Sequence, residues 1–273
     1  MTIHTPLKTK SELRLEQDLY ENLVQIEYNH RKKQCCLEEG QELGSGVLED
    51  VKDWIRNHFR MYKRMYIEVK QPELATYQDI CIIKAVFLSQ HLPLNSLYRD
   101  SRRIIPAVMY LELKLRGVPF YINRLFANDF MTRKEFNRVL QRVSPFHSEY
   151  LARDKKAISK MYISNLADEF KFPQQFLDVA EQVTERYWEN LSYGKEQMIA
   201  GIACCITATL MQESLEIENL GALCDYLGIS YGAVYSPIRA LLAKYGHIEV
   251  EGFPNSSGIV LRRFLPRSEK NRH

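Results

Sequence analysis

The fold is decided by the stretch Ile105-Pro-Ala-Val-Met-Tyr-Leu-Glu-Leu113, with Arg116-Gly-Val-Pro119 and Met131-Thr-Arg-Lys-Glu-Phe-Asn-Arg138 after it. A similar order returns later in Ile199-Ala-Gly-Ile-Ala-Cys-Cys-Ile-Thr-Ala208, then Leu220-Gly-Ala-Leu-Cys-Asp-Tyr-Leu-Gly-Ile-Ser230. Each copy has an apolar helix rich in small residues, a turn containing glycine and a second helix. Self-similarity at a spacing of about one hundred residues predicts a duplicated helical domain. It favours a docking surface over catalysis.

The hydrophobic pattern predicts an all-α chain with a short β-hairpin at its C-terminal end. At 273 residues it is long enough for two domains. We expect a helical extension over 1–46, a first repeat over 47–150, a second repeat over 151–246, and a hairpin with a basic tail over 247–273. The expected helices cover 11–39, 47–70, 77–91, 104–115, 121–126 and 131–142, then 157–170, 173–189, 196–211, 217–227 and 230–245. Alternation around a Gly252–Gly258 turn predicts the hairpin.

Composition and motifs argue against several classes of protein. Hydrophobic residues make up 45% of the chain, yet we find no apolar run long enough for a membrane span and no signal peptide. We therefore expect an intracellular protein, in the cytoplasm or nucleoid, or in the nucleus if the source is eukaryotic. The six cysteines lack zinc spacing, and we find no P-loop, nucleophile elbow or dinucleotide glycine run. The sequence thus predicts no catalytic residue, metal, cofactor, small-molecule substrate or membrane partner.

Charge is distributed unevenly between the repeats. Residues 71–150 hold 11 basic and 7 acidic residues, a balance of +4, whereas residues 151–246 hold 9 and 12, a balance of −3. In the first repeat, cations at one-turn spacing predict a DNA-binding face, with further arginines nearby in the sequence. The predicted DNA-binding residues here are Arg102, Arg103, Arg116, Arg133, Lys134, Arg138 and Arg142. The alternative is an ordinary solvated helix face.

The second repeat ends in a pattern typical of a helix-turn-helix. Helices over 220–227 and 230–245 are joined at Gly228, and the second of two such helices can enter a DNA major groove. With the hairpin as a wing, the pattern also resembles a winged helix. The predicted DNA-binding residues of this part are Ser230, Tyr231, Tyr235, Arg239, Arg262, Arg263 and Arg267. The alternative is that this geometry only closes the helical domain.

These segments, taken in order, resemble the cyclin-like core of the transcription initiation factor IIB family, including archaeal transcription factor B. Gly117-Val-Pro119 and Met131 to Arg138 are similar to two of its segments at the family's spacing. Gly194-Lys-Glu-Gln197 with Ala200-Gly-Ile-Ala203, and Tyr162-Ile-Ser-Asn-Leu166 with Phe172-Pro-Gln-Gln175, are similar to its second repeat. The resemblance covers roughly residues 50–246. It implies two tandem cyclin-like domains, each with five helices.

The resemblance also implies a function, with limits set by three departures. It implies a protein that bridges promoter DNA and a TATA-binding protein, in a general, regulatory or accessory role. We find no zinc ribbon, so contact with RNA polymerase stays open. Ser214-Leu-Glu-Ile217 and Gly232-Ala-Val-Tyr235 replace family segments, and Pro237 lies inside a helix. Two other hypotheses remain: a cyclin-like protein-binding module that does not bind DNA, and a winged-helix regulator.

Overall fold

The computed structural model describes residues 10–38, 46–127, 130–212, 215, 219–246, 248, 250, 259–260 and 263–264. In this part the fold is all-α, as the hydrophobic periodicity predicts. The α-helices are α1 (Lys10–Glu38), α2 (Val47–Val69), α3 (Gln78–Ser89), α4 (Ser101–Leu115), α5 (Ile122–Ala127), α6 (Arg133–Val143), α7 (Ser148–Leu151), α8 (Lys155–Glu169), α9 (Gln174–Arg186), α10 (Trp188–Leu191), α11 (Glu196–Leu210), α12 (Leu220–Tyr226) and α13 (Tyr231–Tyr245). Three 3₁₀ turns are η1 (Pro72–Tyr77), η2 (Leu97–Arg99) and η3 (Ser144–Phe146).

The expected C-terminal hairpin is not found. The described residues contain no β-strand, and Ile259, Val260, Arg263 and Phe264 take a helical conformation. Val260 and Phe264 are fully buried. Residues four apart share a face in a helix as well as in a strand, so their apolar pattern does not distinguish the two structures. The expected turn over 252–258 lies outside the described residues, as do Arg262 and Arg267.

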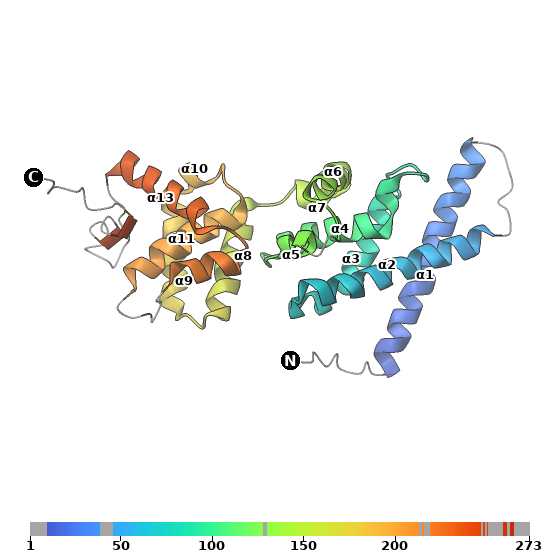
Figure 1. Ribbon diagram of the computed structural model, residues 1–273, viewed down its shortest axis with the longest axis horizontal. Helices are drawn as coiled ribbons and strands as arrows, with labels where there is room; N and C mark the ends of the chain where they lie inside the picture. Colours follow the sequence, from blue (N-terminus) through green and yellow to red (C-terminus); the bar gives the residue numbers. More distant parts are fainter. Residues whose placement is uncertain are drawn as a thin grey trace, which may run out of the picture. The chain divides into compact units, whose positions relative to one another are not determined.

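The chain divides into two compact units. Unit 1 holds residues 1–112 and 121–151, and unit 2 holds residues 113–120 and 152–273. The end of α4 and the turn after it therefore belong to unit 2. Figure 1 shows the helices of each unit in sequence colours. None of the helices formed by described residues has the length and apolar character needed to cross a membrane.

In unit 1, α1 and α2 pack across each other, and α2 also packs against α3 and α5 (Figure 1). The inward face of α2 is apolar, with Val51, Ile55 and Met65 fully buried. From α1, Leu23 and Val24 enter the same core. The spacing of these residues is that of an amphipathic helix facing a core.

Unit 1 also buries a polar cluster where α1 meets α2 and η2. Glu27 of α1 pairs with Arg99, and both side chains are almost completely buried. His58 of α2 is fully buried, and its Nδ1 lies 2.8 Å from the Ser101 hydroxyl and 2.9 Å from the Trp54 carbonyl oxygen. Glu27 also accepts from Arg31 at 2.9 Å, so it is removal of Glu27 that would leave the buried Arg99 guanidinium without a carboxylate partner.

Unit 2 is built around α11, which packs against α8, α9, α12 and α13 (Figure 1). Every residue of α11 from Ile199 to Leu210 is buried. This agrees with its apolar sequence, which is typical of a central helix. At its start, Glu196 is buried and accepts from Lys114 at 2.9 Å and from Arg153 at 2.8 Å.

The turn after α4 docks on α8 within unit 2. Gly117 has a φ of +62°, and a Cβ there would lie 2.6 Å from the Cβ of Met161. The Asn165 amide donates to the Gly117 carbonyl oxygen at 2.9 Å. Glycine is needed at this position for both its backbone conformation and this close approach.

Candidate nucleic-acid interface

Helix α6 forms because its apolar and polar residues fall on opposite sides. Phe136, Val139 and Val143 are buried, and the Phe136 ring meets Tyr110 edge-on at 5.6 Å. At the N-terminus, the Thr132 hydroxyl accepts from the Glu135 backbone N–H at 3.2 Å. The Thr132 backbone N–H in turn donates to the Glu135 carboxylate at 2.9 Å. These reciprocal bonds form a capping box at the start of α6.

The most exposed residues of α6 are cations and amides. Its exposed residues are Arg133, Lys134, Asn137, Arg138, Gln141 and Arg142. The charge pattern of the sequence predicted the four cations, whereas the two amides were missed. Asn137 and Gln141 are one turn apart, and each lies one residue before a predicted cation, so helical spacing was a signal that could have found them. The structure brings all six residues to one side of a single helix.

These four cations are not neutralised within the described part of the chain, where none of them forms an ion pair. Arg133 donates to the Asn123 side-chain oxygen at 3.1 Å, and its guanidinium lies 5.5 Å from the centre of the Phe126 ring. Arg142 lies 5.9 Å from the centre of the Tyr98 ring. Both arginines are therefore held by neutral groups and keep their full positive charge. Arginines in this state are available to an anion.

Glu135, the single acidic residue of α6, lies at the N-terminal end of the helix and is hydrogen-bonded to Thr132. Hydrogen bonds from the Thr132 backbone and hydroxyl lower the pKa of Glu135, so this carboxylate is charged at neutral pH. Arg103 approaches it at 4.0 Å and also pairs with Asp100 at 3.0 Å. Predicted residue Arg103 is thus partly neutralised. It contributes less to the cationic face than its charge alone indicates.

Two further arginines of unit 1 lie beside the residue that leads into α6. Arg102, a predicted residue, is exposed and donates from Nε to the Phe130 carbonyl oxygen at 3.0 Å. Its guanidinium is 5.8 Å from the Phe130 ring centre, and that of Arg64 is 5.4 Å from the same centre. Sequence reasoning missed Arg64, which lies far from α6 along the chain. Predicted residue Arg116 is half-buried and belongs to unit 2.

In unit 2, α12 and α13 are joined by a short turn, where the sequence predicts a helix-turn-helix. The Asn219 side chain caps α12, accepting from the Gly221 N–H at 2.7 Å, and Ser230 caps α13 in the same way at 3.3 Å. Between them, Gly228 has a φ of +68°. The Ile229 N–H then returns to the Cys224 carbonyl oxygen at 3.0 Å. These caps and the left-handed glycine fix the turn.

The predicted residues of α13 are only partly available to a ligand. Tyr231 and Tyr235 are half-buried, 5.8 Å apart, and Tyr235 lies 5.9 Å from the Phe264 ring. Burial raises the pKa of Tyr231. Arg239 is exposed, with its guanidinium 5.7 Å from the Tyr235 ring centre, and Arg263 is exposed. The other exposed residues of the helix include Gly232, Ser236, Ala240, Ala243 and Lys244.

One group of potential metal ligands lies in unit 1, but its hydrogen bonds do not suit a cation. The ligand atoms of Glu112, His147 and Glu149 lie within 4.8 Å of one another. The Tyr150 backbone N–H donates to His147 Nδ1 at 3.2 Å, so the ring proton is on Nε2, which donates to Glu112 at 2.6 Å. Glu149 pairs with Lys84 at 2.8 Å. Both ring nitrogens of His147 are thus engaged in hydrogen bonds within the protein.

Comparison of the chain with protein families, with curated proteins and with solved structures gives no match. The class defined by fold and surface is therefore an all-α protein of two compact units, one of which exposes a cationic helix face.

Proposed function

We propose that this protein binds duplex DNA with the outward face of α6. The observation that carries the proposal is the composition of that face: four cations with no ion pair in the described structure, two amides, and a single acid, Glu135, which is hydrogen-bonded to Thr132 at the N-terminal end. Arginine and lysine bind phosphates and so position a protein on DNA. Asparagine and glutamine can pair with adenine, and arginine with guanine, in the major groove. α6 therefore offers both kinds of contact.

The dimensions of α6 fit this role. Eleven residues make a helix about 16 Å long, and a major groove about 12 Å wide admits one helix. The buried residues on the opposite side hold α6 against Tyr110 and Phe126. Because the backbone of α6 is held by this packing, binding does not have to order it, and the entropic cost is confined to the exposed side chains.

For the whole chain we propose the bridging role that the factor IIB resemblance implies, with cyclin-like repeats and a TATA-binding protein as partner. Unit 2 supplies a separate observation in favour of a protein partner. Tyr193 is 91% exposed and borders a surface hollow with Trp188 and Lys244. Exposed aromatic residues of this kind are enriched in protein interfaces. The acidic balance of residues 151–246 also favours a protein over DNA on this unit. The winged-helix hypothesis requires a hairpin that the described residues do not form.

The test is a mobility-shift titration with a promoter fragment containing a TATA box, with and without a TATA-binding protein, at two salt concentrations. We expect the intact chain to shift the fragment, and the two proteins to give a supershift. The slope of log affinity against log salt is negative. The double variant Lys134→Gln/Arg138→Gln should reduce its magnitude by about 0.9 for each phosphate that the variant no longer neutralises. Lys32→Gln/Lys33→Gln removes the same charge from exposed positions of α1 and serves as the control.

The outcomes separate the two parts of the proposal. Tyr193→Ser should leave the DNA shift unchanged and weaken the supershift. Failure of the intact chain to bind any fragment at low salt would overturn DNA binding and favour the protein-binding module. An equal effect of the α6 and control variants would show that only net charge matters.

A further inference from the structure

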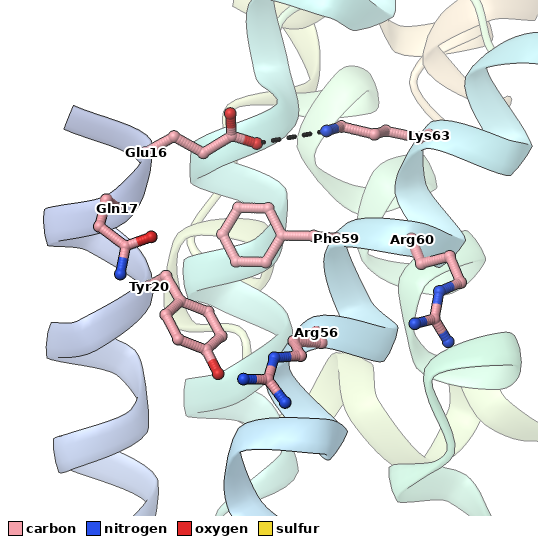
Figure 2. A pocket seen from close by; sticks show the side chains of 7 residues that line it. All are labelled: Glu16, Gln17, Tyr20, Arg56, Phe59, Arg60 and Lys63. Carbon is pink, nitrogen blue, oxygen red and sulfur yellow. Dashed lines mark ion pairs between the residues drawn. The ribbon is translucent and has the colours of Figure 1, made fainter. Parts of the chain in front are cut away.

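A second cationic surface of unit 1 lies between α1 and α2, where the two helices bound a groove of about 440 Å³. Figure 2 shows the Phe59 ring pointing from α2 toward α1. The Glu16–Lys63 ion pair lies on one side of this ring, and Tyr20 and Arg56 lie on the other. The groove therefore has an apolar centre and a wall of cations contributed by α2.

Not all of these cations are neutralised. Lys63 approaches Glu16 at 3.5 Å, and Arg56 pairs with Asp53 at 2.9 Å. Arg60 donates to the Asn57 side-chain oxygen at 2.8 Å and forms no ion pair within the described chain. Arg64, one turn further along α2, also has no carboxylate partner among the described residues. Arg60 and Arg64 are exposed and share a helix face.

Arg64 connects this face to the surface around α6. Its guanidinium and that of Arg102 both lie against the Phe130 ring, at 5.4 and 5.8 Å from its centre. Phe130 comes two residues before Thr132, the N-cap of α6. Arg64 of α2 and Arg102 of α4 thus both lie against Phe130, just before the start of α6. Cations on an aromatic ring remain charged and are restricted in position.

We propose that the α2 face formed by Arg60, Lys63 and Arg64 is a second binding surface for the sugar-phosphate backbone of the duplex that α6 contacts. The inference rests on the proposed DNA binding and extends it. From Arg60 to Arg64 the helix rises about 6 Å, enough for more than one phosphate on a strand with one charge per about 3.4 Å. This surface positions the duplex and reads no sequence.

The proposal makes a specific statement about Glu16. In the free protein the Glu16 carboxylate lies 3.5 Å from the Lys63 ammonium group and competes with a phosphate for this positive charge. Glu16→Gln removes the competing charge while it keeps a side chain of similar size. We therefore expect Glu16→Gln to bind duplex DNA more tightly, by roughly threefold to tenfold at low salt, as a surface charge change of this kind allows. A gain in affinity cannot come from a variant that merely fails to fold.

The experiment compares salt-dependent duplex affinities of the full-length chain and its variants, with folding checked by circular dichroism. The double variant Arg60→Gln/Arg64→Gln should reduce the magnitude of the salt slope by about 1.8, at about 0.9 for each of two phosphates. It should also weaken binding by roughly tenfold or more in about 0.1 M salt. Lys32→Gln/Lys33→Gln is the control for the removal of positive charge. Glu169→Gln, at an exposed position of unit 2, is the control for the removal of negative charge.

Each outcome decides one question. The second surface is supported if Arg60→Gln/Arg64→Gln reduces the magnitude of the salt slope and Glu16→Gln tightens binding, while neither control variant does so. Unchanged binding by Arg60→Gln/Arg64→Gln and by Glu16→Gln, while Lys134→Gln/Arg138→Gln weakens binding, overturns this inference and leaves the α6 proposal intact. Effects equal to those of the controls overturn it as well. If the α2 variants respond and the α6 variant does not, the second surface stands and the placement of DNA on α6 fails.

Discussion

Gly201 lies on α11 where the turn between α12 and α13 packs against it. A Cβ at this position would lie 2.6 Å from the Cδ1 of Ile229 and 3.1 Å from the Cγ2 of Val234. Both contacts are with the ends of side chains, so an added methyl group forces them to shift rather than the backbone. Overpacking of this kind costs about 1–3 kcal/mol, more than the gain of up to about 1 kcal/mol from replacing a helical glycine.

We therefore expect Gly201→Ala to lower the free energy of unfolding by about 1 kcal/mol, measured by urea denaturation. Gly232 provides the matched comparison, because it lies in α13 and a Cβ there meets nothing within 4 Å. Gly232→Ala should leave stability unchanged or raise it by up to about 1 kcal/mol. The packing argument fails if both substitutions stabilise the protein equally.

His58 makes stability depend on pH. Burial lowers its pKa from 6.5 to about 4, against the raising effect of its hydrogen bond to the Trp54 carbonyl. The folded protein thus keeps this ring neutral at pH values where the unfolded chain protonates it. The stabilising contribution is complete above pH 6.5 and is lost as the pH falls toward 4.

The expected loss over this interval is about 3 kcal/mol, at about 1.36 kcal/mol for each unit of pKa. His58→Gln removes the titration, so the variant should start less stable at neutral pH and lose about 3 kcal/mol less on acidification. Urea titrations at several pH values between about 7.5 and 4 measure both curves. Parallel curves for the variant and the original chain would contradict this role of His58.

At the scale of elements, the N-cap of α6 supports the exposed cationic face. Thr132→Ala removes the hydroxyl that accepts from the Glu135 N–H and should cost about 1 kcal/mol of stability. Thr132→Ser keeps this acceptor and should cost little. Hydrogen exchange of the first-turn amides of α6 is the measurement. The same protection in both variants would show that the cap does not hold this helix end.

Helices were the part of the fold that sequence could predict, because each depends on local periodicity and breakers. α11 is the clearest case, since a run apolar on all sides can only be buried. The second strand of the C-terminal hairpin was wrongly predicted at its described residues, because Val260 and Phe264 satisfy the spacing of a helix as well as that of a strand. The four α6 cations followed from helical spacing. Arg64 did not, because its place beside Phe130 depends on tertiary packing between residues far apart in the chain.

At the scale of the whole molecule, two cores predict two unfolding transitions, since chains with several domains often depart from two-state behaviour. Ile55 is fully buried in unit 1 and Val234 in unit 2. Ile55→Ala should lower one calorimetric transition, and Val234→Ala the other, because each leaves a cavity costing about 2–4 kcal/mol in its own core. A single transition lowered equally by either substitution would show that the units unfold together.

The allocation of residues 113–120 to unit 2 affects how the protein can be divided. The chain passes between the units at residues 112/113, 120/121 and 151/152, so no single cut releases either unit whole. A fragment starting at residue 152 lacks the Gly117 turn that docks on α8, and its Glu196 keeps Arg153 but not Lys114. Such a fragment therefore lacks a short segment of its own folded unit. A synthetic segment spanning 113–120, supplied in trans or fused ahead of residue 152, should restore its folding.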